Sequence, residues 1–74
     1  MEEIQLVQAS LNQLKSEYRE TLALRYFEEM PPERIAVVTG RKVKQVYNLL
    51  ARGRQALKDE LTKKGYKVND YENE

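Results

Sequence analysis

The chain has 74 residues, enough for one small domain, because a chain of this length buries only about 60% of its unfolded surface. It contains no cysteine and no histidine, which excludes disulfides and thiolate metal sites and removes the commonest metal ligand and general base. No apolar run approaches the ~18 residues of a membrane span, and no basic-then-apolar leader opens the chain. We therefore expect a cytoplasmic protein without a membrane segment.

The net charge of +1 hides an uneven distribution of charged side chains. Residues 1–33 carry seven acidic and three basic side chains, whereas residues 41–64 carry eight basic and two acidic ones, a net charge of +6. Residues 65–74 are acidic again. A basic segment of this kind indicates a polyanionic partner. The alternative is that these charges only form the solvated surface of a helix.

Two helices are expected in the first half of the chain. One spans residues 2–14, because apolar side chains recur there at intervals of three and four. These side chains are Ile4, Val7, Leu11 and Leu14. The next spans residues 17–29, with Ser16 as its cap and Pro31 and Pro32 as its stop. Its core side is expected to comprise Tyr18, Leu22, Leu24 and Phe27, with Tyr26 beside them.

Two further helices are expected after the prolines. The shorter spans residues 32–39, with Ile35, Ala36 and Val38 in the core, and ends at Gly40 because glycine tolerates the left-handed conformation of a helix terminus. The longer spans residues 43–64, before Gly65. Its buried stripe consists of Val46, Leu50, Gly53, Leu57 and Leu61, with Leu49 beside it.

Gly53 lies in the middle of that last helix, where glycine costs about 1 kcal/mol relative to alanine. We attribute it to a close approach of this helix to the one at residues 17–29. Strand alternation is absent, so we expect an all-α, four-helix domain over residues 1–65, without a wing, and a loose, acidic tail over residues 66–74.

Residues 32–54 indicate a helix-turn-helix, because a short helix, a tight turn at glycine and a longer basic helix follow one another. The small Ala36 allows the second helix to cross closely, and Gly40 lies where the chain must reverse. Val46 and Leu49 are placed to pack back onto the first helix. Such a unit inserts its second helix into the major groove of duplex DNA.

The outward face of residues 43–55 carries side chains suited to reading DNA. The amides of Gln45 and Asn48 can pair with adenine and Lys44 with guanine. Tyr47 is expected to contact a thymine methyl or a phosphate, and Arg52, further along, the backbone.

Arg41 and Lys42 stand where a capping serine or aspartate is usual, and cations there oppose the helix dipole by about 0.3–1 kcal/mol each. Nearby phosphates would turn this unfavourable interaction into a favourable one, which indicates a phosphate contact. The alternative is that both side chains are solvated and contact no phosphate. Arg54 lies at the edge of the buried sector, where we favour pairing with Glu20 or Glu28 over a contact with DNA. Asp59–Lys63 and Glu60–Lys64 are expected to be surface ion pairs.

Residues 11–61 resemble the fourth conserved region of bacterial RNA polymerase sigma factors, especially the extracytoplasmic-function type. The resemblance lies in the YRE run at 18–20, the LALRYFE run at 22–28, the ERIA run at 33–36 with Gly40, and the RGRQAL run at 52–57. It implies a domain that binds the minus-35 promoter element, docks on the β flap of RNA polymerase, and is inhibited by anti-sigma factors.

The resemblance also implies contacts for individual residues. It places Lys44, Gln45, Tyr47 and Asn48 at base- and backbone-contacting positions. Arg41, Lys42 and Arg52 are placed near phosphates.

The chain departs from the family at four of these positions. At the position of Arg41 the family usually has an apolar residue, and at that of Lys42 a capping serine. At the position of Gln45 it commonly has a threonine, and at that of Tyr47 often a basic residue. The preferred DNA sequence is therefore open, and the region that reads the minus-10 element is missing from these 74 residues.

No constellation of acid, base, nucleophile or metal ligands is present, so we expect no enzyme, no cofactor, no metal and no small-molecule substrate. The expected function is promoter binding in transcription initiation. The alternatives are a stand-alone, dimeric helix-turn-helix regulator, separable by sedimentation, or a domain that binds polymerase or an anti-sigma factor without DNA. A single helix-turn-helix buries only about 600–1,000 Å² on DNA, so we expect weak, salt-sensitive binding that needs help from a larger partner.

Overall fold

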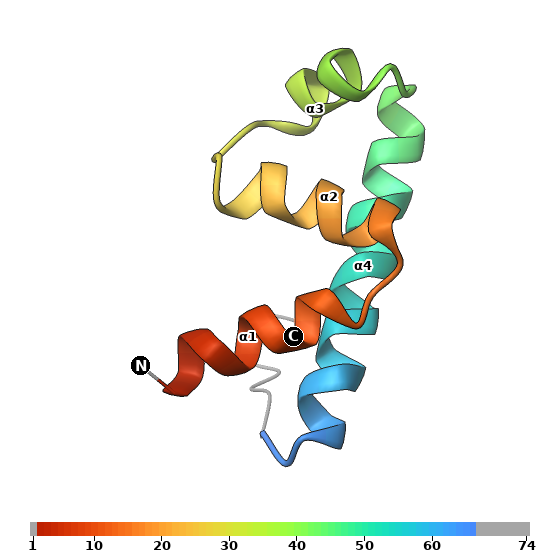
Figure 1. The fold of residues 1–74 in the computed structure, drawn as a ribbon. Helices are drawn as coiled ribbons and strands as arrows, with labels where there is room; N and C mark the ends of the chain where they lie inside the picture. Colours follow the sequence, from red (N-terminus) through yellow and green to blue (C-terminus); the bar gives the residue numbers. More distant parts are fainter. Residues whose placement is uncertain (1, 67–74) are drawn as a thin grey trace, which may run out of the picture.

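The computed structural model describes residues 2–66, with side chains from residue 5 onward. It contains four helices, α1 (Glu2–Asn12), α2 (Ser16–Tyr26), α3 (Pro32–Thr39) and α4 (Val43–Lys63), and no strand within the described residues. The long helix α4 forms one side of the molecule (Figure 1), with α3 near its N-terminal end and α1 near its C-terminal half. The prediction of an all-α, four-helix domain is confirmed for the described residues, whereas the tail beyond Tyr66 and the side chain of Ile4 lie outside them.

One apolar core joins all four helices. Ile35 of α3 and Val46 of α4 are completely buried, and Leu22 of α2 and Leu50 of α4 are each 3% exposed. Leu11 of α1 and two further residues complete the buried cluster, namely Leu14 and Ala36. Most of these residues belong to the predicted stripes, so apolar periodicity located most of the core.

Gly53 marks the place where α4 passes closest to α2. A Cβ atom at this position would lie 3.3 Å from Cγ and Cδ1 of Leu22 and 3.5 Å from Cβ of Tyr18. The glycine is buried against these side chains. The predicted reason for a glycine in mid-helix, a close approach of the two helices, is therefore confirmed.

The end of α2 differs from the prediction. The helix stops at Tyr26, and the amide of Met30 donates to the carbonyl of Leu24 (3.0 Å) across Glu29, which adopts a left-handed φ of 56°. This turn, rather than the prolines, ends the helix. Tyr26 and Phe27 are consequently 52% and 59% exposed, so their predicted place in the core is wrong.

The turn between α3 and α4 is built as predicted. Gly40 adopts a left-handed φ of 71°, and the amide of Arg41 donates to the carbonyl of Ala36 (3.0 Å), which satisfies the end of α3. Ile35 and Ala36 are buried, but Val38 is 52% exposed. Its placement in the core is wrong, because α3 contacts the rest of the domain through a narrower face than its three apolar residues suggest.

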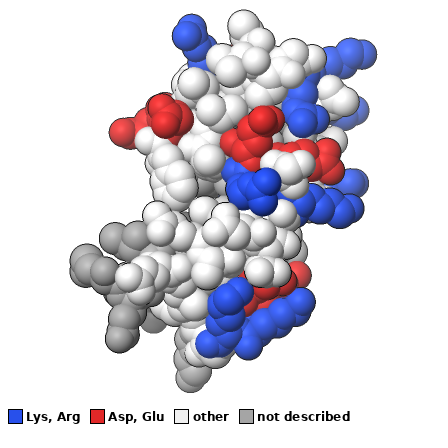
Figure 2. Space-filling model, viewed as in Figure 1, with Lys and Arg blue, Asp and Glu red and all other residues white. Residues whose placement is uncertain are grey.

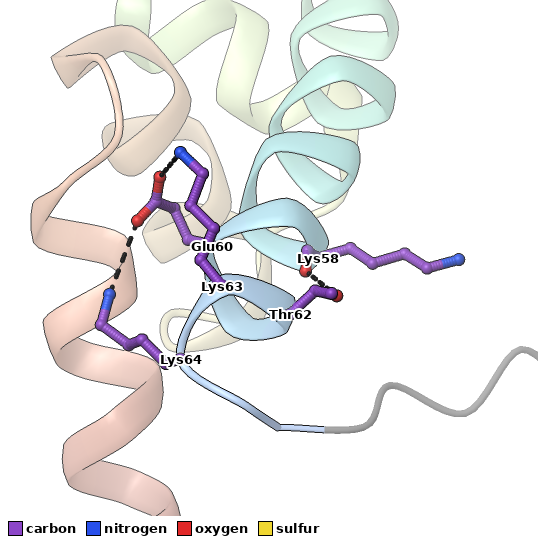
Figure 3. Close-up of polar contacts among 5 residues, drawn as sticks. All are labelled: Lys58, Glu60, Thr62, Lys63 and Lys64. Atoms are coloured by element: carbon purple, nitrogen blue, oxygen red, sulfur yellow. Dashed lines mark hydrogen bonds and ion pairs between the residues drawn. The ribbon is translucent and has the colours of Figure 1, made fainter.

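Two local details of the helix termini also differ from the prediction. Lys15, not Ser16, is the N-cap of α2, and no side chain caps this helix. At the end of α4, Glu60 accepts from both Lys63 (3.2 Å) and Lys64 (3.5 Å), as Figure 3 shows. The predicted Glu60–Lys64 pair is confirmed, but the Asp59–Lys63 pair is not, because Lys63 turns to Glu60.

Candidate nucleic-acid interface

The first turns of α4 present one polar face to solvent, as predicted. Lys44, Gln45, Tyr47, Asn48 and Arg52 are all exposed, whereas Val46, Leu50 and Gly53 on the opposite face are buried. Lysine and arginine side chains gather along the α4 side of the molecule (Figure 2). The fold therefore holds a row of polar and cationic groups on one rigid helix.

Four of the predicted site residues line one shallow hollow of about 170 Å³: Arg41, Gln45, Asn48 and Arg52. Their spacing of four, three and four residues places them on one stripe. Leu49 and Glu17, the latter from the first turn of α2, complete the lining. The hollow thus brings two guanidinium groups and two amides together next to one carboxylate.

Arg41 is the least exposed of the predicted cations. It is half-buried, and its Nε is buried without a hydrogen-bond partner in the described part of the chain. A buried donor of this kind is costly until it finds an acceptor. Arg41 therefore carries a donor that none of the described residues satisfies.

Gln45 has a structural task that sequence reasoning missed. Its Oε1 accepts a hydrogen bond from the backbone N–H of Lys42 (3.0 Å), which is the N-cap residue of α4. This bond satisfies one of the unpaired amides at the start of the helix. A bidentate contact with adenine uses both ends of the amide and so competes with this bond.

Tyr47 links the two helices of the helix-turn-helix. Its hydroxyl donates to Oε2 of Glu33 in α3 (3.2 Å). The hydrogen bond to Glu33 and the negative charge of that carboxylate raise the pKa of Tyr47 above its ordinary value of 10.0. The neutral form of the phenol is therefore favoured, and its hydroxyl is directed to Glu33.

The remaining two predicted residues, Lys42 and Lys44, are exposed and lie outside the lining of the hollow. Sequence reasoning missed Glu17 and Glu33 as members of this surface. Both are acidic residues on other helices, and no local pattern connects them with α4.

Arg54 does not form the predicted pair with Glu20 or Glu28. Its Nη1 donates to the hydroxyl of Tyr26 (3.1 Å), because Tyr26 and not an acidic residue faces α4 at the end of α2. The expectation of an acidic partner is wrong, although a partner on α2 exists.

Arg54 and Tyr26 belong to a second concave surface, an apolar groove of about 320 Å³ between α1, α2 and α4. Its other lining residues are Val7, Leu11, Leu22, Phe27, Leu57, Lys58 and Leu61. Residues other than Lys, Arg, Asp and Glu cover much of the face around α1 in Figure 2. The exposed aromatic rings of Tyr26 and Phe27 therefore belong to a groove rather than to the core.

A family model described as sigma-70, region 4, matches residues 4–57. The chain belongs to the sigma-70 region 4 family. Comparisons with curated proteins and with solved structures gave no match. The matched residues include α3, the turn, α4 as far as Leu57 and every residue of the hollow.

Region 4 of sigma factors is a DNA-binding helix-turn-helix domain that works with RNA polymerase, and the family is not an enzymatic one. Within residues 2–66, no group of three or more Asp or Glu side chains is placed to hold a metal ion. In the same part of the chain, no helix is long and apolar enough to cross a membrane.

Proposed function

We propose that this region 4 domain binds the minus-35 promoter element in the cytoplasm as part of a sigma factor, with α4 in the major groove. The observation that carries this proposal is the exposed face of α4, which presents Lys44 and Asn48 at four-residue spacing opposite a fully buried stripe. A helix in the groove reads base edges with such a face.

The proposed roles follow from position. Lys44 and Asn48 read bases. The phosphates on one side of the groove are contacted by Arg41, Lys42 and Arg52, and the edge on the other side of the groove is contacted by Tyr47. Gln45 orients the start of α4 and donates to DNA through its nitrogen.

The test measures fluorescence anisotropy on a duplex selected from a random pool by the wild-type domain. Each good bidentate contact with a base contributes about 1–3 kcal/mol, so we expect Lys44→Ala with Asn48→Ala to weaken binding at least tenfold and to erase the preference for the selected sequence. Lys63→Ala is the matched control, because it removes a cation at the far end of α4 that is paired with Glu60. Unchanged affinity of the double variant at low salt would show that α4 does not enter the groove.

Arg52→Ala separates phosphate contacts from base contacts. We expect it to weaken binding to all sequences about equally and to reduce the slope of affinity against salt by about one. A loss confined to the selected sequence would contradict its assignment to the backbone.

We further propose that the apolar groove between α1, α2 and α4 receives the β flap of RNA polymerase, and that an anti-sigma factor would compete there. The half-exposed Phe27 ring supports this, because exposed aromatic rings in a concave apolar surface are typical anchors for a protein partner. Phe27→Ser should abolish binding to core polymerase while DNA affinity is retained. Val37→Ser is the control, because Val37 is 79% exposed on α3 and lies outside the groove.

A further inference from the structure

One acidic side chain lies inside the surface that the proposed function assigns to DNA. Glu17 comes from the first turn of α2 and lines the same hollow as Arg41, Asn48 and Arg52. It is half-buried, whereas Glu20, one turn further along α2, is exposed and does not line the hollow. Glu17 therefore lies among the groups that would meet a phosphate.

Glu17 does not neutralise either arginine by direct contact. In the described part of the chain no ion pair joins it to Arg41 or Arg52, and neither arginine has another acidic partner there. The space between these side chains is the hollow itself, about 170 Å³. The two guanidinium groups thus stay available to an anion, while the carboxylate faces the same space.

An anion in this hollow would meet opposite effects. Arg41 lines the hollow and has no acidic partner in the described residues, and a phosphate oxygen is a strong acceptor for a guanidinium group. The Glu17 carboxylate has the same sign of charge as a phosphate and would repel it in this hollow. It also occupies the start of α2, where free backbone amides would otherwise attract an anion.

Glu17 has a reason to stay at this position apart from DNA. The N-cap of α2, Lys15, makes no side-chain capping bond, and a carboxylate in the first turn stabilises such a helix through its dipole. The same charge therefore favours the fold and opposes the phosphate.

We propose, on the basis of the DNA-binding function above, that Glu17 is the residue that limits the affinity of this domain for DNA. Its negative charge repels the DNA phosphate that Arg41 and Arg52 attract and lowers the affinity for every duplex by a similar factor. The domain then holds a promoter firmly only when polymerase contributes its own contacts.

The experiment compares Glu17→Gln with Glu20→Gln, measured by anisotropy on the selected duplex and on a scrambled duplex. Both variants remove one negative charge from the same helix, but only Glu17 lines the hollow. From the Coulomb interaction of two unit charges several ångströms apart near a surface, we expect Glu17→Gln to bind both duplexes about three- to tenfold more tightly at low salt. Glu20→Gln should change the affinity less than about twofold, because solvent screens it.

Glu17→Asp keeps the charge and should bind DNA as the wild type does, and circular dichroism checks that all three variants remain helical. Equal gains for Glu17→Gln and Glu20→Gln would show that only the total charge matters and would overturn the proposal. Weaker binding by folded Glu17→Gln would overturn it too, because Glu17 would then position the arginines.

The wild type and the Lys44→Ala, Asn48→Ala double variant distinguish this inference from the proposed function. If the double variant loses affinity and Glu17→Gln gains none, only the role of Glu17 fails. If the double variant binds as tightly as the wild type, the groove assignment fails.

Discussion

The substitution Gly53→Ala tests the contact that brings Glu17 of α2 next to α4. Two effects oppose each other in this variant. Alanine favours the helix over glycine by about 0.8–1.0 kcal/mol. The added Cβ would lie 3.3 Å from Cγ and Cδ1 of Leu22, inside the ordinary carbon–carbon separation of about 3.5–4.0 Å.

The steric effect should be the larger one. Leu22 is 3% exposed and has Tyr18 beside it, 3.5 Å from the same Cβ position, so it has little room to move. Overpacking a core costs about 1–3 kcal/mol. We therefore expect Gly53→Ala to lower the free energy of unfolding by about 1 kcal/mol, and Gly53→Val, with two more methyl groups, by about 3 kcal/mol.

The assay is urea unfolding followed by far-ultraviolet circular dichroism. Ala51→Gly is the control, because Ala51 is exposed two residues earlier in α4 and reports helix propensity alone, a loss of about 1 kcal/mol. If Gly53→Ala stabilises the domain by as much as Ala51→Gly destabilises it, the close approach of α2 and α4 is refuted.

Three further outcomes concern single hydrogen bonds. The bond to Glu33 raises the pKa of Tyr47, so its stabilising effect is present below pH 10 and is lost as pH rises through the raised value; Glu33→Gln should lower that pKa in an NMR titration of the ring. Gln45→Ala should lower the free energy of unfolding by about 0.5–1 kcal/mol in urea, because the Lys42 amide loses its acceptor. Gln45→Glu keeps an acceptor and should be as stable as the wild type, but it should bind DNA more weakly. Equal stability of Gln45→Ala and the wild type would argue against the cap. The hydrogen bond from Lys63 lowers the pKa of Glu60, so its contribution is present above pH 4.5 and disappears as pH falls through the lowered value; Lys63→Ala should raise the pKa of Glu60, measured by NMR of the carboxyl carbon.

The buried stripe of α4 could be predicted because it depends on the helical period alone. Val46 and Leu50 recur at intervals that place them on one face, and the residues between them must then be exposed. Gly40 was likewise predictable as a turn, since a left-handed residue at a helix end favours glycine. These features depend on interactions within a few residues along the chain.

The end of α2 was harder to predict. Phe27 continues the apolar spacing of the helix, and the two prolines offer a stop further on. The chain instead turns at Glu29, a residue type that rarely adopts a left-handed φ, and Phe27 leaves the core. Apolar spacing shows which side chains share a face, but not whether another helix covers that face.

The sequence by itself determined the four helices, the helix-turn-helix and the exposed, cationic face of α4, because each depends on local spacing and backbone preference. Only the tertiary structure decided which residues of α2 and α3 lie beside α4: Glu17 beside Arg41 and Arg52, Glu33 bonded to Tyr47, and, in the apolar groove, Tyr26 bonded to Arg54. These pairs join residues 14 to 35 positions apart. Their distances depend on how closely α2 and α3 pack on α4, and packing follows from the shapes of many side chains together rather than from any single segment.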